Sequence, residues 1–241
     1  MTATGLPIEI ADVFVSYDKR QILHGLGFTV APGEVFGLVG LNGAGKTTLI
    51  RAILGLAPCE GSIRLFGAPS TDHRARRNLV YLPEKFVPSP QLKGWEYLGL
   101  VRAAYGLALD RAQATLAARA LDFDPAVLDR GVRTYSKGMA QKLGLVGTFI
   151  TGLPLLILDE PMSGLDPRAR VLLKDRLLAC KAEGRSVFFS SHILSDIEEI
   201  CDRIGVIHQG RLLWLGTPRD FVAGTGAATL ERAFLSAIER A

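Results

Sequence analysis

The 241-residue sequence predicts an α/β fold with a mainly parallel sheet, an antiparallel β edge and an inserted helical subdomain. Short apolar strands that alternate with helical segments are typical of a parallel sheet covered on both faces. Near residues 86–150 the composition changes, and Ala and Leu recur at helical spacing without a strand signal. The strands before Gly33 precede this alternation, so we expect them to form the antiparallel edge.

The first part of the chain contains short strands and one helix. The turn Ala31-Pro32-Gly33 ends the second strand, and Pro83 stops the last of this group. We expect strands at Ile8–Val15, Gly25–Val30, Val35–Val39, Ser62–Phe66 and Leu79–Leu82, and a helix from Lys46 to Gly55.

The second part of the chain begins with helical character and then returns to strands. Helical spacing covers Trp95–Leu121 and Gly138–Ile150, and a final amphipathic segment covers Ala228–Ala241. Strands are expected at Leu155–Leu158, Val187–Ser190 and Ile204–His208, followed by a hairpin around Gly210. We therefore expect one domain over residues 1–241, with a core at 1–85 and 151–241 and a helical subdomain at about 86–150.

Charge and composition exclude several classes of protein. With 48% hydrophobic and 22% charged residues, the chain is typical of a folded globular protein and not of a disordered one. The net charge is only +4, and we interpret the densest basic cluster as a solvated face. Because nucleic-acid-binding proteins usually carry a stronger basic stripe, no nucleic-acid partner is expected. The cluster consists of His73, Arg74, Arg76 and Arg77.

Cysteine usage and hydropathy indicate a reducing compartment and no membrane span. Cys59, Cys180 and Cys201 lie far apart, and no two of them form a CxxC pair. The uncharged stretch at residues 143–158 contains glycines and Pro154 and is shorter than the roughly 20 apolar residues of a membrane helix. We expect a chain that is soluble by itself, without a secretion signal, and that reaches a membrane only through a partner.

The strongest chemical signal is a glycine-rich turn between an expected strand and an expected helix, where residues 40–47 match GxxxxGK[ST]. The glycines let backbone N–H groups point at phosphate oxygens, and the helix adds its positive N-terminal end. Lys46 would contact the β- and γ-phosphates, and the Thr47 hydroxyl would bind Mg²⁺. The pattern predicts a P-loop NTPase core. The candidate phosphate-binding residues are Gly40, Leu41, Asn42, Gly43, Ala44, Gly45, Lys46, Thr47 and Thr48.

Two acids follow a buried strand and form the second candidate feature. The apolar run Leu155–Leu158 leads directly into Asp159 and Glu160, and ligands bind at the carboxyl ends of strands in open α/β sheets. Asp159 would hold Mg²⁺, partly through water, and Glu160 would be the catalytic residue that polarises the attacking water. Alone, the pair could be a solvated acidic turn; beside a phosphate cradle, we favour the metal and catalytic roles.

With the P-loop, the later motifs of the chain resemble those of ABC ATPases in type and order. The YSKGM run resembles the family's signature motif and lies 23 residues before Asp159, counted from Ser136. The resemblance covers nearly the whole chain. The matching segments are Tyr135–Met139 with Gln141-Lys142 (signature), Asp159–Pro167 (Walker B and D-loop), Ser190-Ser191-His192 (switch histidine), Cys201-Asp202-Arg203, Gly210 and Gly216.

The resemblance implies a site shared between two chains. In the family, two such domains pack head to tail, and the signature motif of one covers ATP on the P-loop of the other. Ser136 and the Gly138 backbone would then contact the partner's γ-phosphate. Tyr17 would stack on adenine, and His192 would contact the γ-phosphate as a catalytic residue. From the residues alone, Ser136 could be a plain helix N-cap, Tyr17 a half-buried strand residue and His192 a core histidine.

The resemblance also implies partners and a location. The cofactors would be ATP and Mg²⁺, and the partners would be a second ATP-binding subunit, identical or different, and a membrane permease. The permease would insert a short helix into a groove beside the segment that begins at Glu84, the family's Q-loop. The chain would be cytoplasmic and peripheral on the inner face of the cell membrane. The YSKGM motif favours export over import.

One position departs from the family pattern. The family usually places glutamine after the strand that ends here at Leu82, whereas this sequence has Glu84 after Pro83. A carboxylate is a hard oxygen ligand, so we expect Glu84 to contact Mg²⁺. The alternative is that Glu84 points to solvent and only ends the strand. This variant, like YSKGM, resembles exporter-type subunits.

Two other functions remain to be weighed against a transport motor. A non-transport ABC ATPase that acts on DNA, ribosomes or an assembly complex usually carries coiled-coil insertions, tandem ATPase domains or distinct tails, and none is visible in this sequence. A P-loop kinase or GTPase does not explain the signature motif, and the sequence has no NKxD guanine-recognition motif. The transport motor is therefore the leading hypothesis.

Overall fold

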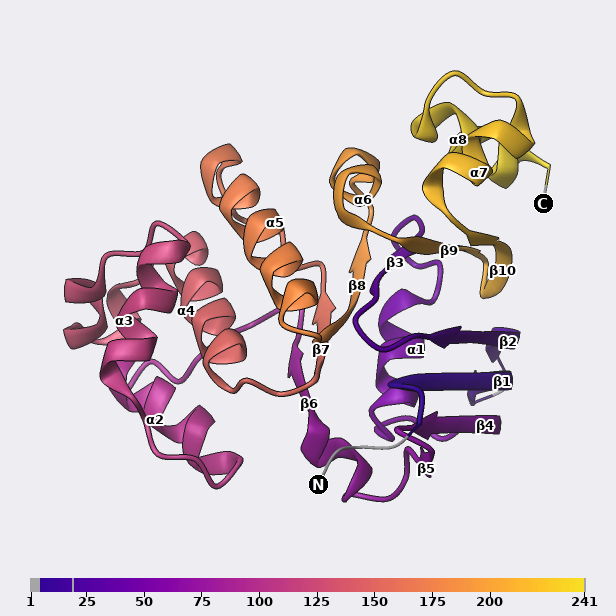
Figure 1. Ribbon diagram of the computed structural model, residues 1–241. Coiled ribbons are helices and arrows are strands. Elements are labelled where there is room, and N and C mark those ends of the chain that lie inside the picture. Colours follow the sequence, from indigo (N-terminus) through magenta and orange to yellow (C-terminus); the bar gives the residue numbers. More distant parts are fainter. Residues whose placement is uncertain (1–4, 19, 241) are drawn as a thin grey trace.

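The computed structural model describes residues 5–18 and 20–240, and two sheets organise them (Figure 1). The larger sheet has six strands in the order β10-β9-β3-β8-β7-β6, and the smaller has four in the order β2-β1-β4-β5. The strands of the larger sheet are β3 Val35–Val39, β6 Leu79–Leu82, β7 Leu155–Asp159, β8 Ser186–Ser191, β9 Arg203–His208 and β10 Arg211–Gly216. Those of the smaller sheet are β1 Ile8–Tyr17, β2 Arg20–Val30, β4 Glu60–Leu65 and β5 Ala68–Pro69.

The larger sheet is parallel except at one edge. Strands β9, β3, β8, β7 and β6 run parallel to their neighbours, and only β10 pairs antiparallel, with β9. The smaller sheet is antiparallel throughout. The predicted α/β fold with a mainly parallel sheet and an antiparallel edge is therefore confirmed. The edge is itself a separate sheet, in which β4 pairs with β1 although the two strands are far apart in the sequence.

Helix α1 (Lys46–Ile53) contacts both sheets and fills the space between them. One core cluster joins apolar side chains of α1 to the facing sides of β1, β2, β4 and the parallel strands. Three aromatic rings stack through this layer: the centroids of Phe28 and Phe36 are 5.0 Å apart, and those of Phe36 and Phe188 are 5.7 Å apart. Helices α5 (Pro167–Ala182) and α6 (Leu194–Ile200) contact strands of the larger sheet, and their buried apolar side chains belong to the second core cluster.

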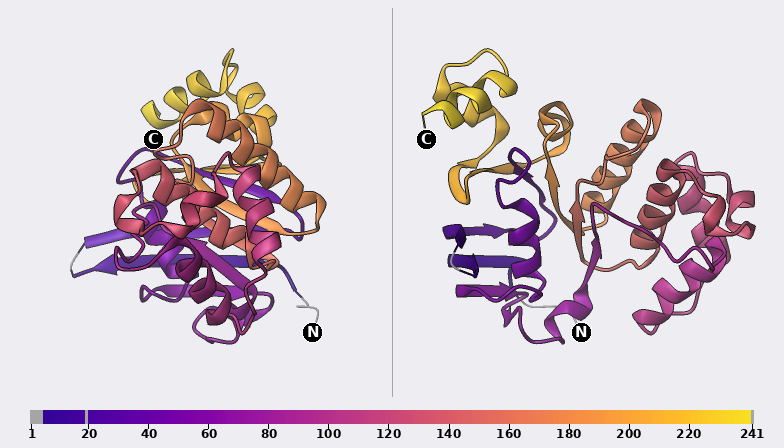
Figure 2. Two further views of the ribbon diagram at one scale, coloured as in Figure 1. Left: turned by 90° about the vertical axis from the view of Figure 1, so that its left-hand side faces the viewer. Right: turned by 180° about the vertical axis from the view of Figure 1, so that it is seen from behind.

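The predicted helical segment contains α2 (Gly94–Ala104), α3 (Arg111–Ala120) and α4 (Lys137–Ile150), which lie together at one end of the molecule (Figures 1 and 2). The single helical run expected over Trp95–Leu121 is two helices. Gly106, at a φ of +69°, turns the chain after α2, and Asp110 caps α3 by accepting from the N–H groups of Ala112 and Gln113. Short 3₁₀ turns at Ala75–Asn78, Pro125–Asp129 and Val132–Thr134 complete the connections.

The chain ends in two short helices, α7 (Pro218–Thr225) and α8 (Leu230–Glu239), at the opposite end from α2–α4 (Figure 2). The predicted C-terminal helix is α8; residue 241 lies outside the described residues. Among the residues that the structure describes, no helix combines the length and the apolar character that crossing a membrane requires.

Candidate functional site

The glycine-rich turn joins β3 to α1 at the carboxyl edge of the parallel sheet. Gly45 precedes α1 at a φ of +109°, which favours glycine, and a Cβ added at Gly40 would lie 2.5 Å from the carbonyl oxygen of Ile207. Helix α1 has no side-chain cap and no acidic residue in its first turn. The N–H groups at its start are therefore not used by a side chain, and the positive end of the helix faces the turn.

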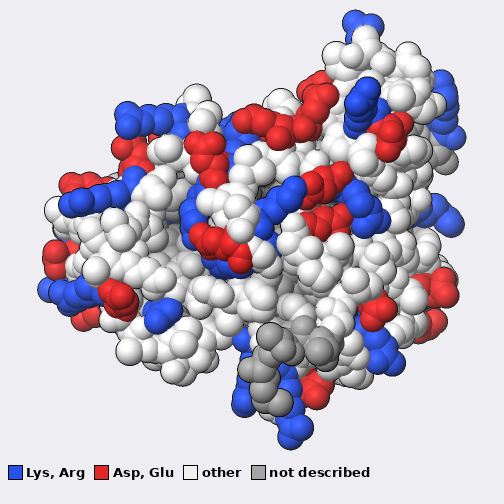
Figure 3. Space-filling model, viewed as in Figure 1, with Lys and Arg blue, Asp and Glu red and all other residues white. Residues whose placement is uncertain are grey.

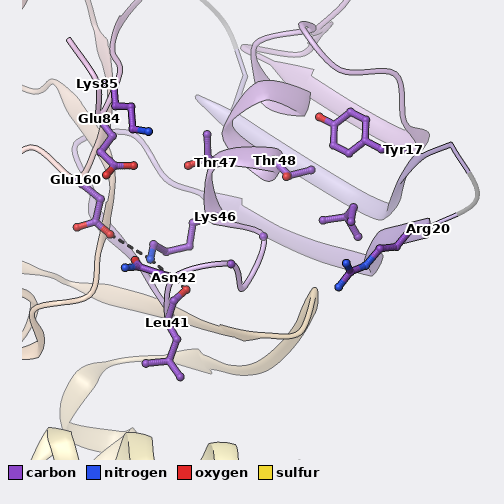
Figure 4. A pocket seen from close by; sticks show the side chains of 13 residues that line it. Tyr17, Arg20, Leu41, Asn42, Lys46, Thr47, Thr48, Glu84, Lys85 and Glu160 are labelled. Atoms are coloured by element: carbon purple, nitrogen blue, oxygen red, sulfur yellow. Dashed lines mark hydrogen bonds and ion pairs between the residues drawn. The ribbon is translucent and has the colours of Figure 1, made fainter.

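A cavity of about 530 Å³ lies over this turn (Figure 4). The strand residues Tyr17, Arg20 and Ile22 line one end, and Glu84, Lys85 and Glu160 line the other. The turn and the start of α1 supply the floor. These floor residues are Leu41, Asn42, Gly43, Gly45, Lys46, Thr47 and Thr48. Of the predicted phosphate-binding residues, only Gly40 and Ala44 are buried beneath the lining and do not contact the cavity.

Oxygen ligands suited to a hard cation meet at the start of α1. The Thr47 hydroxyl donates a 2.9 Å hydrogen bond to Asp159 Oδ2, although the two residues come from different elements. The Ser190 hydroxyl donates to the other carboxylate oxygen, Asp159 Oδ1, at 2.5 Å. Mg²⁺ usually keeps several waters and binds one or two protein oxygens together with substrate phosphates. The Thr47–Asp159 pair fits that requirement, and the described residues contain no cluster of three or more His, Cys, Asp and Glu that would hold a metal by themselves.

Glu160 is buried, and both of its carboxylate oxygens face cationic or polar groups. Oε1 lies 3.1 Å from Lys46 Nζ, an ion pair without hydrogen-bond geometry, and Oε2 lies 2.8 Å from His192 Nδ1. The Glu160 N–H donates to Ser190 Oγ at 2.9 Å, and the backbone has a φ of +48°, which is uncommon outside glycine. Lys46 also donates to the Gly40 carbonyl at 2.6 Å. The Glu160 carboxylate is therefore held between Lys46 and His192 at the edge of the cavity over the P-loop.

Glu84 and its neighbour Lys85 both line the cavity over the P-loop. Figure 4 shows Glu84 and Lys85 pointing toward the space in front of Thr47. Neither side chain forms a hydrogen bond or ion pair with another residue in the described part of the chain. Burial, together with the charges of Asp159 and Glu84, raises the pKa of Tyr81 to about 12, so its hydroxyl stays protonated beside these acids. The exposed Glu84 side chain therefore borders both the cavity and bulk solvent.

The signature segment lies in a different place. Ser136 caps α4 by accepting a 3.2 Å hydrogen bond from the Met139 N–H. A Cβ added at Gly138 would lie 3.0 Å from the Gly164 carbonyl oxygen, so the start of α4 packs closely on the loop before α5. Ser136 and Gly138 line a separate cavity of about 240 Å³. Within one chain, the structure does not bring them to the P-loop.

Three residues of the candidate site were not predicted from the sequence: Ser190, Arg20 and Lys85. Ser190 bridges Asp159 and the backbone of Glu160, whereas its motif suggested only a neighbour of His192. Arg20 and Lys85 line the cavity beside Tyr17 and Glu84. The sequence indicated Arg20 and Lys85 only through their neighbours. Arg20 pairs with Tyr17 across the β1–β2 hairpin, and Lys85 follows Glu84.

A glycine-rich phosphate cradle with adjacent hydroxyl and carboxylate ligands defines a P-loop nucleotide-binding protein. The comparisons with known proteins narrow the class. The model of the family described as "ABC transporter" matches residues 23–163, and the chain therefore belongs to the ABC transporter family. The prediction of an ABC-type ATPase domain is confirmed at the level of the family.

Individual relatives agree with this assignment. The chain is 41% identical over 204 residues to an uncharacterized ABC transporter ATP-binding protein of Nostoc sp., covering 83% of this chain and 61% of that protein. It is 37% identical to a Nod factor export ATP-binding protein I of Burkholderia thailandensis, covering 90% of this chain and 72% of that protein. A solved structure titled "Structure of ATP binding subunit of ABC transporter" aligns with a TM-score of 0.87 at 34% identity, covering 95% of this chain and 98% of that one. The chain thus spans about three fifths of the Nostoc relative's length.

Proposed function

We propose that this chain binds and hydrolyses ATP and thereby powers transport of a substrate across a membrane by a partner permease. It would do so as one domain over residues 1–241, with the core at 1–85 and 151–241 and the helical subdomain at about 86–150. The proposal rests on the contacts between the P-loop and the two acids at the end of β7. Thr47 bonds to Asp159, and Lys46 pairs with Glu160.

In this proposal, different residues along the cavity contact the adenine, the phosphates and the metal. Tyr17 stacks on adenine at the strand end, the turn and the α1 N-terminus bind the phosphates, and Lys46 leaves Glu160 to contact the β- and γ-phosphates. Glu160 then polarises the attacking water, and His192 contacts the γ-phosphate. Mg²⁺, when bound, neutralises phosphate charge, and Thr47, Asp159 and Glu84 are the residues that would hold it.

The proposed partners are a second ATP-binding subunit and a permease. Ser136 and the Gly138 backbone would cover the partner's γ-phosphate, because they lie at a helix N-terminus away from this chain's own P-loop. The name of the Burkholderia relative supports export as the direction. On the face in Figure 3, basic and acidic side chains are interspersed and form no single basic stripe, which supports a protein partner over a nucleic acid. The chain would lie on the cytoplasmic face of the cell membrane.

The test combines chemistry with identification of the partner. The purified chain should release phosphate from ATP in the presence of Mg²⁺, and a tagged chain recovered from its own host should bring down a membrane-spanning protein. Absence of phosphate release from both the chain and that complex would contradict the ATPase proposal. Recovery of ribosomes or nucleic acid instead of a membrane protein would favour the non-transport alternative.

A further inference from the structure

Helices α5 and α6 are joined by a cluster of charges, two of which are buried. Lys174 on α5 pairs with Glu199 on α6, and its Nζ lies 3.6 Å from Asp196 Oδ1, also on α6. The side chains of Lys174 and Asp196 are only 11% and 8% exposed, whereas that of Glu199 is 57% exposed. Burial opposes the charge on Lys174, but the hydrogen bond and charge of Glu199, together with Asp196, raise its pKa, so the lysine stays protonated.

Helix α6, which carries Asp196 and Glu199, begins directly after the turn that contains the candidate catalytic residue His192. His192 occupies the turn between the end of β8 at Ser191 and the start of α6 at Leu194. Helix α6 has no side-chain cap at Ile193. Two buried apolar side chains, Ile197 and Ile200, anchor the middle and end of the helix in the core. Besides this apolar packing, the ion pairs of Asp196 and Glu199 with Lys174 link α6 to α5.

The contacts of Asp196 indicate that Lys174 does more than fill space between α5 and α6. Asp196 Oδ2 is buried and has no hydrogen-bond partner among the described residues, so Lys174 is the charge that compensates this carboxylate. A second ion pair on the same helix offers a contrast. Arg176 pairs with Glu183 at 2.7 Å, but both residues belong to α5 and its C-terminal end and make no link to α6.

We propose that Lys174 is a positioning residue for ATP hydrolysis: by binding Asp196 and Glu199, it orients α6 so that His192 Nδ1 stays in hydrogen-bond contact with Glu160. The inference rests on the proposed function for its catalytic consequence. The positional part can be measured separately, because it concerns only the 2.8 Å contact between His192 Nδ1 and Glu160 Oε2.

The experiment compares Lys174→Met, Lys174→Arg and the matched control Arg176→Met. The chain has four histidines, so the ring signals of His192 can be assigned in NMR spectra by their loss in His192→Gln. In the nucleotide-free chain, Lys174→Met should shift the His192 ring signals, whereas Lys174→Arg and Arg176→Met should leave them near their wild-type positions. In steady-state assays, Lys174→Met should lower kcat on the order of tenfold with ATP affinity unchanged, because a small misplacement near the reacting atoms slows chemistry.

Glu199→Gln is the second variant if Lys174→Met does not fold, since Glu199 is largely exposed and the amide keeps its shape. It should produce the same pattern with a smaller effect. His192 signals that superimpose on those of the wild type, or a kcat that is unchanged in an active background, would overturn the proposal. A loss of ATP affinity equal to the loss of kcat would also overturn it, because that pattern indicates general distortion. If the wild type released no phosphate at all, the proposed function would fail while the NMR comparison still decided the position of His192.

Discussion

The P-loop and the signature segment both place the N-terminus of a helix at a cavity, yet they differ in what surrounds that N-terminus. The start of α1, which includes Lys46, has no side-chain cap and lies beside Asp159 at the end of β7 and Glu160 directly after it. The start of α4 is capped by Ser136, and its cavity contains neither a P-loop lysine nor the Thr47–Asp159 pair.

The difference teaches what each helix start can do alone. The first brings a lysine, a hydroxyl and two carboxylates together around an uncapped helix start, so we expect one chain to bind nucleotide. The second offers backbone donors, the Ser136 hydroxyl and Lys142 but no Thr47–Asp159 pair, so we expect a phosphate that binds there to be held mainly by the P-loop of another chain. The predictions below test this division, from the largest expected effect to the smallest.

Changing Glu160 to Gln should separate binding from chemistry at the P-loop. The amide keeps the shape of the carboxylate but cannot accept the proton of water, so kcat should fall by about 10² to 10⁴. ATP binding should remain, and with Mg-ATP the variant should elute as a dimer in size-exclusion chromatography. A variant that stays monomeric and still hydrolyses ATP would contradict both the role of Glu160 and the composite site.

Changing Lys46 to Ala should weaken ATP binding by roughly 10- to 150-fold, the equivalent of about 1.5–3 kcal/mol for a hydrogen bond to a charged group. Equilibrium binding of labelled ATP to the isolated chain measures the effect. Lys142→Ala is the matched control, because Lys142 lies near the other helix start and donates to the Asp122 carbonyl. Equal losses in the two variants would show that the two regions do not differ in the way proposed.

Changing Ser136 to Arg should leave ATP binding to the monomer intact and block ATP-driven dimerisation, because a long cation would occupy the surface at the start of α4. The measurement is size-exclusion chromatography of Ser136→Arg in the Glu160→Gln background. Ser136→Thr, which can still cap α4, is the control and should dimerise. Weakened ATP binding by the Ser136→Arg monomer would point instead to disruption of the helical region.

The same two regions show how far the sequence could predict the molecule. The P-loop and the β7 acids form continuous motifs, so local pattern sufficed to place Lys46, Thr47, Asp159 and Glu160 at one edge of a parallel sheet. Ser136 lies at a cavity separate from the P-loop, and its contact with a partner's phosphate stays a prediction. The distance between the two cavities could not be derived from spacing alone.

What the sequence could not predict depends on contacts between distant residues. Ser190 reaches Asp159 because β8 pairs with β7, a register that only the folded sheet defines. The pairing of Glu160 with both Lys46 and His192 depends on side-chain conformation at three separate elements. The break between α2 and α3 was missed because Ala- and Leu-rich flanks outweighed the local signals of Gly106 and Asp110.

The smallest expected effect concerns Glu84, the position at which the P-loop cavity differs from the family pattern. Its carboxylate points into the cavity near Thr47 and adds negative charge near Glu160 and an incoming γ-phosphate. Repulsion should disfavour closure of two subunits over ATP without metal, and Mg²⁺ should offset it. Closure should therefore depend more strongly on Mg²⁺ than it would with glutamine.

Glu84→Gln tests this expectation, with ATPase rate and dimerisation measured across a Mg²⁺ titration. The half-maximal Mg²⁺ concentration should shift by a few-fold, on the order of 1 kcal/mol for one partly exposed charge, and some metal-free dimer should form only in the variant. Lys85→Met is a useful companion, because Lys85 is the neighbouring cation in the same cavity and its loss should raise the dependence on Mg²⁺ instead. Superimposable titrations of Glu84→Gln and the wild type would leave Glu84 as a residue that only ends β6. The metal would then be held by Thr47, Asp159 and the phosphates.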